Sequence, residues 1–187
     1  MFNKILIANR GEIAVRIIRA CREMGIKTVA VYSEADRDAL HTQLADEAVC
    51  IGPAQAADSY LDMEKIISAT IITKAEAIHP GFGFLSENSR FATLCEKCNI
   101  KFIGPDAALI ESLGNKSEAK NTMQAAGVPV IPGTKKPVYD WQEGLKFADE
   151  AGYPVIVKAA LGGGGKGMRV VSSHYEFEHE FLTAQRE

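Results

Sequence analysis

The sequence predicts an α/β protein in which a doubly wound parallel sheet is followed by part of a second domain. Short apolar segments alternate with amphipathic helical segments through the first part of the chain. This β-α-β order implies parallel strands joined by right-handed crossovers. A different pattern comes near the C-terminal end, where two short apolar strands flank four consecutive glycines. The length of 187 residues suits one domain and part of another.

The first domain is expected to span residues 1–113. Lys4–Ala8 reads as a buried strand, and the helix from about Glu12 to Met24 carries an apolar stripe at helical spacing. Gly25 is expected to end this helix. Further strands are predicted over residues 27–32, 47–51, 75–78 and 101–103, and further helices over about 40–45, 58–73, 86–97 and 106–113. Asp58 or Ser59 and Ser86 are the predicted caps of two of them.

The second domain, residues 114–187, is expected to begin where Gly114-Asn115-Lys116-Ser117 interrupts the helical pattern. Helices are predicted from Ser117 to about 126, from a cap at Asp140 to about 151, and from about Tyr175 to the last residue. Two strands, Val155–Val157 and Met168–Val171, flank the glycine-rich loop.

This glycine-rich loop is a candidate phosphate-binding site. Glycine has no Cβ and adopts φ > 0 freely, so backbone N–H groups can approach an anion closely. Lys158 and Lys166 add charges suited to phosphate. We interpret the segment as a flap over a nucleoside triphosphate; the alternative is a hairpin tip without a ligand. A Walker A loop is excluded because Ala160 and Gly167 occupy its glycine and hydroxyl positions, and a dinucleotide fingerprint because a strand follows.

The turn after the predicted strand 75–78 is a second candidate site. It reads His79-Pro80-Gly81-Phe82-Gly83-Phe84-Leu85-Ser86-Glu87-Asn88. Glycines here allow a close approach to a ligand, and such turns lie at the carboxyl edge of a parallel sheet, where ligands bind. A tight structural turn is the alternative. A ribose-binding role for the acidic loop Ser33–Asp38 is discounted, because the first turn holds only Gly11.

Composition narrows the classes of function. The net charge of −3 gives no basic field for nucleic acid, and no apolar run approaches the length of a membrane span. Met1 leads directly into a strand without a signal segment, so a cytoplasmic location is expected. Four cysteines suggest reduced thiols. We interpret Cys95-Glu96-Lys97-Cys98 as two thiols near a helix end rather than a zinc or redox site, because no second pair exists.

The segment Tyr153–Val171 resembles the nucleotide-binding flap of the ATP-grasp ligases, and most resembles that of the biotin carboxylases. Lys4–Ala14 is similar to the start of that family. Residues 79–88 are similar to its motif His-Pro-Gly-Tyr-Gly-Phe-Leu-Ser-Glu-Asn, with Phe82 replacing the tyrosine. The likeness runs along the whole chain. It implies a Rossmann-like pre-ATP-grasp domain followed by an incomplete ATP-grasp domain.

The resemblance also implies site residues. The residues implied to bind ATP are Lys116, Lys158, Gly163, Gly164, Gly165, Lys166 and Met168. Those implied to border the biotin site are Gly81, Phe82 and Gly83. No catalytic residue and no metal ligand of the family is expected in this portion.

The implied activity is the ATP- and bicarbonate-dependent carboxylation of biotin on a carrier protein, with Mg²⁺, as the first half-reaction of acetyl-CoA carboxylase. The implied partners are the biotin carboxyl carrier protein, carboxyltransferase subunits and a second copy of the chain. For that dimer, the charged face of the first helix with Arg16, Arg19 and Glu23 is the candidate contact; a solvated face is the alternative. No nucleic acid or membrane partner is expected.

The resemblance further implies that the chain is the amino-terminal portion of a longer enzyme. The family's magnesium ligands, bicarbonate-binding residues and general base lie further downstream, so the chain by itself is expected to be inactive. Two alternatives remain open. One is another ATP-grasp ligase, such as a carbamoyl-phosphate synthetase domain, and the other is a non-catalytic nucleotide-binding module.

Overall fold

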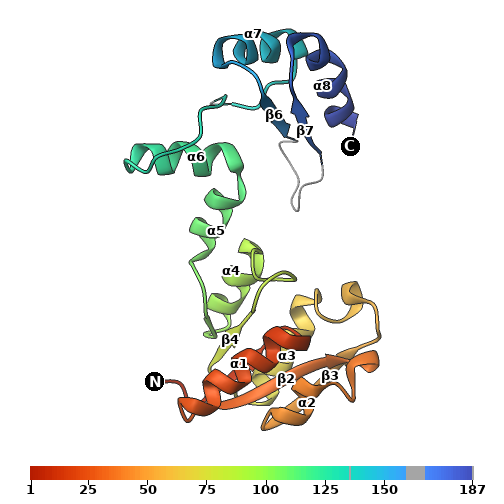
Figure 1. Cartoon of the computed structure of the whole chain (residues 1–187). Coiled ribbons are helices and arrows are strands. Elements are labelled where there is room, and N and C mark those ends of the chain that lie inside the picture. Colours follow the sequence, from red (N-terminus) through yellow and green to blue (C-terminus); the bar gives the residue numbers. More distant parts are fainter. Residues whose placement is uncertain (135, 159–166, 187) are drawn as a thin grey trace. The chain divides into compact units, whose positions relative to one another are not determined.

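A computed structural model describes residues 1–134, 136–158 and 167–186, without the side chains of Lys116 and Ser117. The chain divides into two compact units, Met1–Glu111 and Ser112–Glu187, called unit 1 and unit 2 below. Figure 1 shows both units. Helix α5, Ala107–Gly114, contains both this division and the predicted boundary at residues 113 and 114.

Unit 1 is built on one five-stranded sheet in which every neighbouring pair is parallel. The strand order is β3-β2-β1-β4-β5. The strands are β1 Lys4–Ile7, β2 Lys27–Ser33, β3 Glu47–Gly52, β4 Ala77–His79 and β5 Lys101–Phe102. All five strands were predicted, and the doubly wound α/β class is confirmed.

Helices cover both faces of this sheet. The helices of unit 1 are α1 Gly11–Glu23, α2 Leu40–Leu44, α3 Met63–Ile72 and α4 Ser89–Lys97, followed by α5. Side chains along β1 alternate, because successive strand residues point to opposite faces. Ile5 and Ile7 pack with Ile18 of α1, whereas Leu6 packs in the cluster that contains residues of α3 and α4. The two faces therefore have separate apolar cores, and each fully buried aliphatic side chain contributes about 1.5–3 kcal/mol.

Two predicted helix caps are wrong. The helix predicted to start after Asp58 or Ser59 begins at residue 63, and Asp62 caps it by accepting a hydrogen bond of 3.1 Å from the backbone three residues on. A short 3-10 turn comes first and allows the ring of Tyr60 to enter the core, where it is fully buried. The next helix is capped by Asn88 (2.9 Å) rather than Ser86, because residues 84–87 form a turn in which the backbone N–H of Ser86 donates to Gly83 and that of Asn88 donates to Leu85.

Unit 2 contains an antiparallel hairpin covered on one face by helices. Its elements are α6 Lys116–Ala125, α7 Trp141–Ala151, β6 Val155–Lys158, β7 Met168–Val171 and α8 Phe177–Arg186. Asp140 caps α7 as predicted, accepting a hydrogen bond of 3.0 Å from the backbone of Gln142. Figure 1 shows α7 and α8 on one side of the hairpin, and their core cluster contains Ala148, Val171 and Phe181.

The two cysteines of the Cys-x-x-Cys segment lie at the C-terminal end of α4, as predicted. Cys95 is fully buried, and burial followed by the neighbouring Cys98 raises the pKa of its thiol to about 12. Such a thiol is a poor nucleophile and a poor metal ligand. Across the described residues, no group of three His, Cys, Asp or Glu side chains is placed to hold a metal, and no helix is long and apolar enough to cross a bilayer.

Candidate functional site

Two predicted nucleotide-binding residues lie opposite each other at the loop end of the unit 2 hairpin, where the glycine-rich segment joins the two strands. In the antiparallel register, Lys158 of β6 pairs with Met168 of β7, and Ile156 pairs with Val170. These four side chains lie on the face of the hairpin turned away from the core, since the alternate residues Val155, Val157 and Val171 pack against the helices. Directly opposed residues in such a ladder have Cβ atoms about 4.5–5.5 Å apart.

This open face is apolar except for its lysine. The exposed fractions are 54% for Ile156, 44% for Met168 and 64% for Val170. Exposed apolar side chains in a contiguous group mark a binding surface more often than an ordinary solvated one. Nucleotide sites combine apolar side chains with a few placed charges, so an apolar face with a cation at its end can form one wall of such a site.

The remaining nucleotide-binding predictions are not brought together by the structure. Gly163, Gly164, Gly165 and Lys166 lie outside the described residues. Lys116 is the first residue of α6, and its side chain also lies outside the description. These five assignments therefore stay predictions.

The second candidate site lies where the strand order of unit 1 reverses. Ligands of open α/β sheets bind outside the carboxyl ends of the strands at such a point. Here the central neighbours are β1 and β4, so the residues that follow them share one edge. Asn9 and Arg10 follow β1, and residues 80–84 follow β4. We call residues 80–84 the β4–α4 loop.

Asn9 holds the β4–α4 loop through its buried amide. Its Nδ2 donates to the carbonyl oxygens of Pro80 (2.7 Å) and Phe82 (2.8 Å), and its Oδ1 accepts from the backbone N–H of Arg10 (2.9 Å). Only 3% of Asn9 is exposed. A Cβ added at Gly81, whose φ is +67°, would lie 2.7 Å from Asn9 Nδ2, so only glycine fits there without displacing the amide.

The three predicted biotin-border residues lie within this loop. Gly81 and Gly83 both have positive φ, and the Phe82 side chain is 64% exposed. His79 is not free to act as a base here, since its Nδ1 accepts a hydrogen bond from the backbone N–H of Gly81 (3.0 Å). Burial lowers the pKa of His79, which keeps the ring neutral and able to accept that bond.

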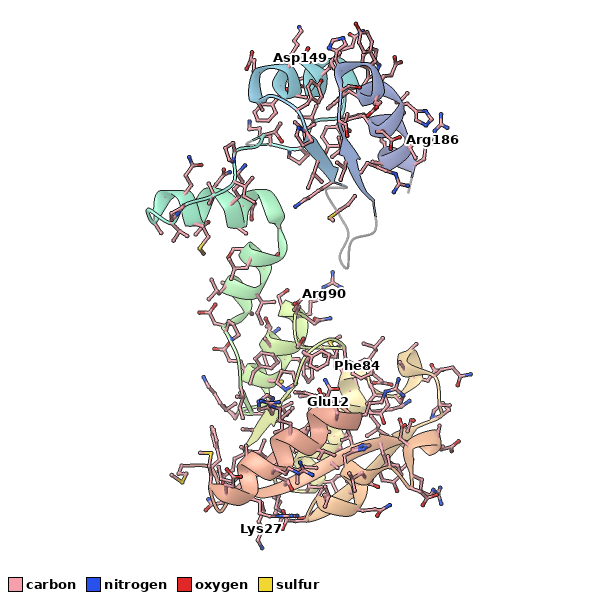
Figure 2. All side chains as sticks on the ribbon, viewed as in Figure 1. Glu12, Lys27, Phe84, Arg90, Asp149 and Arg186 are labelled. Atoms are coloured by element: carbon pink, nitrogen blue, oxygen red, sulfur yellow. The ribbon has the colours of Figure 1, made fainter. Side chains whose placement is uncertain are left out.

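A charged and aromatic cluster supports the same edge of the sheet. Arg10 Nη1 lies 3.2 Å from Asp36 Oδ2, and its guanidinium carbon lies 5.4 Å from the ring centroid of Tyr60 and 5.6 Å from that of Phe84. The two rings stack with centroids 5.1 Å apart. These distances are within cation–π range. Figure 2 labels Phe84 of the β4–α4 loop and Glu12 in the first turn of α1.

The carboxylate of Asp36 joins the cluster together. Its Oδ2 accepts hydrogen bonds from Tyr60 Oη (2.6 Å) and Ser33 Oγ (2.9 Å) in addition to the contact with Arg10. Burial raises the pKa of Asp36, but these hydrogen bonds outweigh burial and leave the pKa below its usual value of 3.8. Burial and the bond to Asp36 raise the pKa of Tyr60 to about 12. Asp36 is thus a stable anion and Tyr60 a neutral donor.

Sequence reasoning missed this cluster. It placed Arg10 in a turn and discounted Asp36 as a ribose ligand. The available signal was position: both residues follow predicted strands whose carboxyl ends meet at one edge. Tyr60 gave no signal, because the turn that buries it was read as helix.

The charged face of α1 lines a surface hollow of about 750 Å³. The hollow is lined by Arg16, Arg19 and Glu23, together with Leu40 and His41 of α2. The three charged residues therefore lie on one face of α1, as predicted. His41 Nε2 lies 3.2 Å from the carbonyl oxygen of Val31, which fixes the buried ring against β2.

Comparisons with known proteins agree along the whole chain. Residues 1–110 match the family model "Biotin carboxylase, N-terminal domain", and residues 115–187 match "Carbamoyl-phosphate synthase L chain, ATP binding domain". The chain is 56% identical over 187 residues to biotin carboxylase 1 of Bacillus subtilis and 59% identical over 186 residues to the biotin carboxylase of a Nostoc species. Each alignment covers 100% of this chain but 42% of the relative.

Solved structures give the same result. A crystal structure of a biotin carboxylase–beta-gamma-ATP complex from Campylobacter jejuni matches with a TM-score of 0.94 and 51% identity over 100% of this chain and 42% of that chain. The biotin carboxylase domain dimer of the Hydrogenobacter thermophilus 2-oxoglutarate carboxylase, bound to MgADP, ADP and bicarbonate, matches with a TM-score of 0.91 and 48% identity over 100% and 41% of the two chains. The first family model covers more than half of the chain, and the chain therefore belongs to the biotin carboxylase family, corresponding to the amino-terminal part of its members.

Proposed function

We propose that this chain carries the amino-terminal part of an ATP-dependent ligase that carboxylates biotin with bicarbonate. The main support is the pairing of Lys158 with Met168 on an open apolar face, within a chain of this family. The relatives of known structure were captured with beta-gamma-ATP or with MgADP, ADP and bicarbonate, which are ligands of the proposed reaction.

In this proposal the unit 2 hairpin binds the nucleotide. Ile156, Met168 and Val170 provide the apolar surface for the base, and Lys158 provides the cation nearest the phosphates. A fixed positive charge stabilises a transferring phosphoryl group because negative charge spreads over its oxygens in the transition state. Lys116 and residues 163–166 are proposed to complete the phosphate contacts, on the basis of the family resemblance.

Mg²⁺ neutralises phosphate charge in reactions of this class. The parts of the chain that the structure describes offer no set of three carboxylate, imidazole or thiol groups for it. We propose that its ligands belong to the part of the enzyme outside these residues.

The β4–α4 loop is proposed to border the biotin site. Its backbone is fixed by Asn9, while Phe82 projects an exposed apolar ring. Phenylalanine has no hydroxyl, so position 82 is proposed to contribute packing against biotin rather than a hydrogen bond.

Members of this family differ in the molecule that finally accepts the carboxyl group. We propose acetyl-CoA carboxylase and fatty acid synthesis in the cytoplasm, with the biotin carboxyl carrier protein and carboxyltransferase subunits as partners. Relatives of similar identity include one of the subunits of a pyruvate carboxylase (57%) and the alpha chain of a methylcrotonoyl-CoA carboxylase (55%). An assay of the full-length enzyme with each acyl-CoA and keto acid, together with its own carboxyltransferase, decides between these acceptors.

The face of α1 with Arg16, Arg19 and Glu23 is proposed as a two-fold dimer contact. A two-fold interface sets the same surface against itself, so opposite charges on one face are self-complementary. Arg19→Glu is expected to weaken the dimer about tenfold, and adding Glu23→Arg is expected to restore it. Analytical ultracentrifugation of the full-length enzyme measures the dissociation constants, and equal dissociation constants for wild type and Arg19→Glu would exclude this contact.

The central experiment measures ADP release by the full-length enzyme as bicarbonate and biotin are added separately. Release that requires both substrates supports the proposal. Release without biotin at the same rate would instead favour another ATP-grasp ligase. A melting temperature that does not rise with ATP, for the full-length enzyme, would argue against any nucleotide-binding function.

A further inference from the structure

The β4–α4 loop is held by side chains that follow another strand, in addition to local hydrogen bonds such as that from Gly81 N–H to His79 Nδ1. Its residues 81, 83 and 84 all have positive φ, including the non-glycine Phe84 at +42°. A non-glycine residue in this region is strained, and such a conformation persists only where surrounding contacts impose it. The contacts in question come from Asn9 and Arg10, which follow β1.

Asn9 uses every hydrogen-bonding group of its side chain except one lone pair of Oδ1. Both of its Nδ2 hydrogens are used, on carbonyls two residues apart, and its Oδ1 is used by Arg10 N–H. Aspartate has no donor and would set a carboxylate against two carbonyl oxygens. Alanine would leave the buried carbonyl of Pro80 without its donor. The spacing of the two accepting carbonyls therefore depends on this one amide.

Arg10 acts on the opposite end of the loop. Its guanidinium contacts the ring of Phe84, which stacks on Tyr60, and Asp36 fixes the guanidinium from the other side. Tyr60 is itself held in place, since its Oη both donates to Asp36 and accepts from Ser33 N–H (3.0 Å). The ring of Phe84 thus has a rigid partner, and the loop between Pro80 and Phe84 is fixed at both ends.

We propose that Asn9 and Arg10 are positioning residues for the β4–α4 loop, setting where Phe82 and the flanking glycines meet biotin. The inference rests on the proposed function for the identity of the substrate. It assigns neither residue a contact with biotin or ATP. Its consequence is selective: loss of either residue impairs the use of biotin while leaving nucleotide binding in unit 2 unchanged.

The first experiment tests the loop alone and needs no activity. Hydrogen exchange of the 187-residue chain is measured for wild type, Asn9→Ala and Arg10→Ala. The control Asn3→Ala removes another side-chain amide, which lies just before β1 and donates through Nδ2 to Glu76 Oε1 just before β4 (2.7 Å). The bond from the backbone N–H of Asn3 to Glu76 (3.0 Å) remains in this variant. Arg22→Ala is the control for loss of an exposed guanidinium, which here donates to the carbonyl of Leu44.

Faster exchange at residues 81–84 in the two test variants, with unchanged exchange in β1 and β2, supports the inference. Loop exchange equal to wild type in Arg10→Ala would overturn it. Should Asn9→Ala fail to fold, the Arg10 variants still decide, because Arg10 is partly exposed and its loss leaves the amide of Asn9 in place.

The second experiment measures steady-state kinetics in the full-length enzyme. Arg10→Ala is expected to reduce kcat/KM for biotin about tenfold to a hundredfold through misplacement of the loop, with KM for ATP unchanged. Arg10→Lys is expected to recover part of this loss, because lysine keeps the pairing with Asp36 but lacks the planar group over the rings. Both controls are expected to match wild type.

The outcomes separate the two proposals. A faster-exchanging loop with normal kinetics for biotin would overturn the positioning role while the proposed function stands. Equal losses for biotin and ATP would mean general destabilisation and would also overturn it. A wild-type enzyme without biotin-dependent ADP release would overturn the proposed function and the substrate assigned to the loop, and hydrogen exchange would still report whether Asn9 and Arg10 fix its backbone.

Discussion

The two candidate sites are positioned by different means. At the β1–β4 edge of unit 1, a buried amide and a stacked pair of rings fix the backbone of a short loop. At the loop end of the unit 2 hairpin, backbone pairing sets Lys158 opposite Met168, and both side chains lie on the exposed face. The first site is thus preformed by side-chain contacts. The second presents side chains at fixed spacing that are free to adjust to a ligand.

The largest expected effect is at the unit 2 hairpin. Lys158→Ala in the full-length enzyme should lose about 2–4 kcal/mol of transition-state stabilisation, about 10²–10³-fold in rate, because a preorganised cation near the phosphates is removed. Fold stability should change little, since the side chain is exposed. Lys146→Ala, which removes an exposed lysine from α7, is the matched control. An ATP-dependent rate equal to wild type would remove Lys158 from the nucleotide site.

A glycine pair tests whether the unit 1 loop is preformed. Gly81 and Gly83 have nearly equal φ values of +67° and +66°, so alanine at either position costs about 1–2 kcal/mol of backbone strain. Only Gly81→Ala also places a Cβ against Asn9 Nδ2, whereas no atom lies within 4 Å of a Cβ at Gly83. We expect Gly81→Ala to be the more destabilising by at least about 1 kcal/mol in urea unfolding. Equal losses would mean that Asn9 yields freely and does not fix the loop.

Much of the fold followed from local patterns. Each strand of the first domain was a short apolar run between turn signals, and β-α-β order determines parallel pairing. The helix cap at Asp140 was equally local, and it is confirmed. The cap at Asn88 was missed because the loop before it is held by Asn9, which is 71 residues from Pro80 in sequence. No local pattern carries a contact over that separation.

The residues of the candidate sites were likewise predicted only where they belong to one local pattern. Lys158 and Met168 were found because a strand–loop–strand pattern brings its two ends together. The cluster of Arg10, Asp36 and Tyr60 was missed because its members follow three different strands and meet only at the sheet edge. Residue type gave no help either, since an arginine, an aspartate or a tyrosine is each ordinary at a protein surface.

The dependence of stability on acid pH can be compared between the two units, because each contains a carboxylate with a lowered pKa, Asp36 in unit 1 and Asp149 in unit 2. Despite burial, hydrogen bonds hold the pKa of Asp36 below 3.8, and a hydrogen bond from His174 does the same for the pKa of Asp149. A lowered carboxyl pKa stabilises the fold fully above the unfolded value, and this stabilisation is lost as the pH falls through the folded value. Asp36→Asn removes this titrating group, so the melting temperature of the variant should decrease less steeply than that of wild type as the pH falls below about 4. Asp149→Asn should change this slope less, because Asp149 is exposed. A larger change for Asp149→Asn than for Asp36→Asn would contradict this prediction, and would mean that the exposed carboxylate of unit 2 stabilises the fold more than the Asp36 cluster of unit 1.

The smallest expected effect is at the exposed tip of the unit 1 loop. Phe82→Tyr restores the hydroxyl found in the family motif, on a ring that is 64% exposed, so the stability should stay within about 0.5 kcal/mol of wild type. If the preformed loop holds this ring at the biotin site, the added hydroxyl can form one hydrogen bond at the low end of the usual range, about 0.5 kcal/mol, or roughly a twofold lower KM for biotin. Phe84→Tyr is the contrasting variant, because that ring stacks on Tyr60 and is expected to change stability rather than KM. A KM for biotin that responds to Phe84→Tyr but not to Phe82→Tyr would place the substrate against the stacked rings instead of the exposed tip.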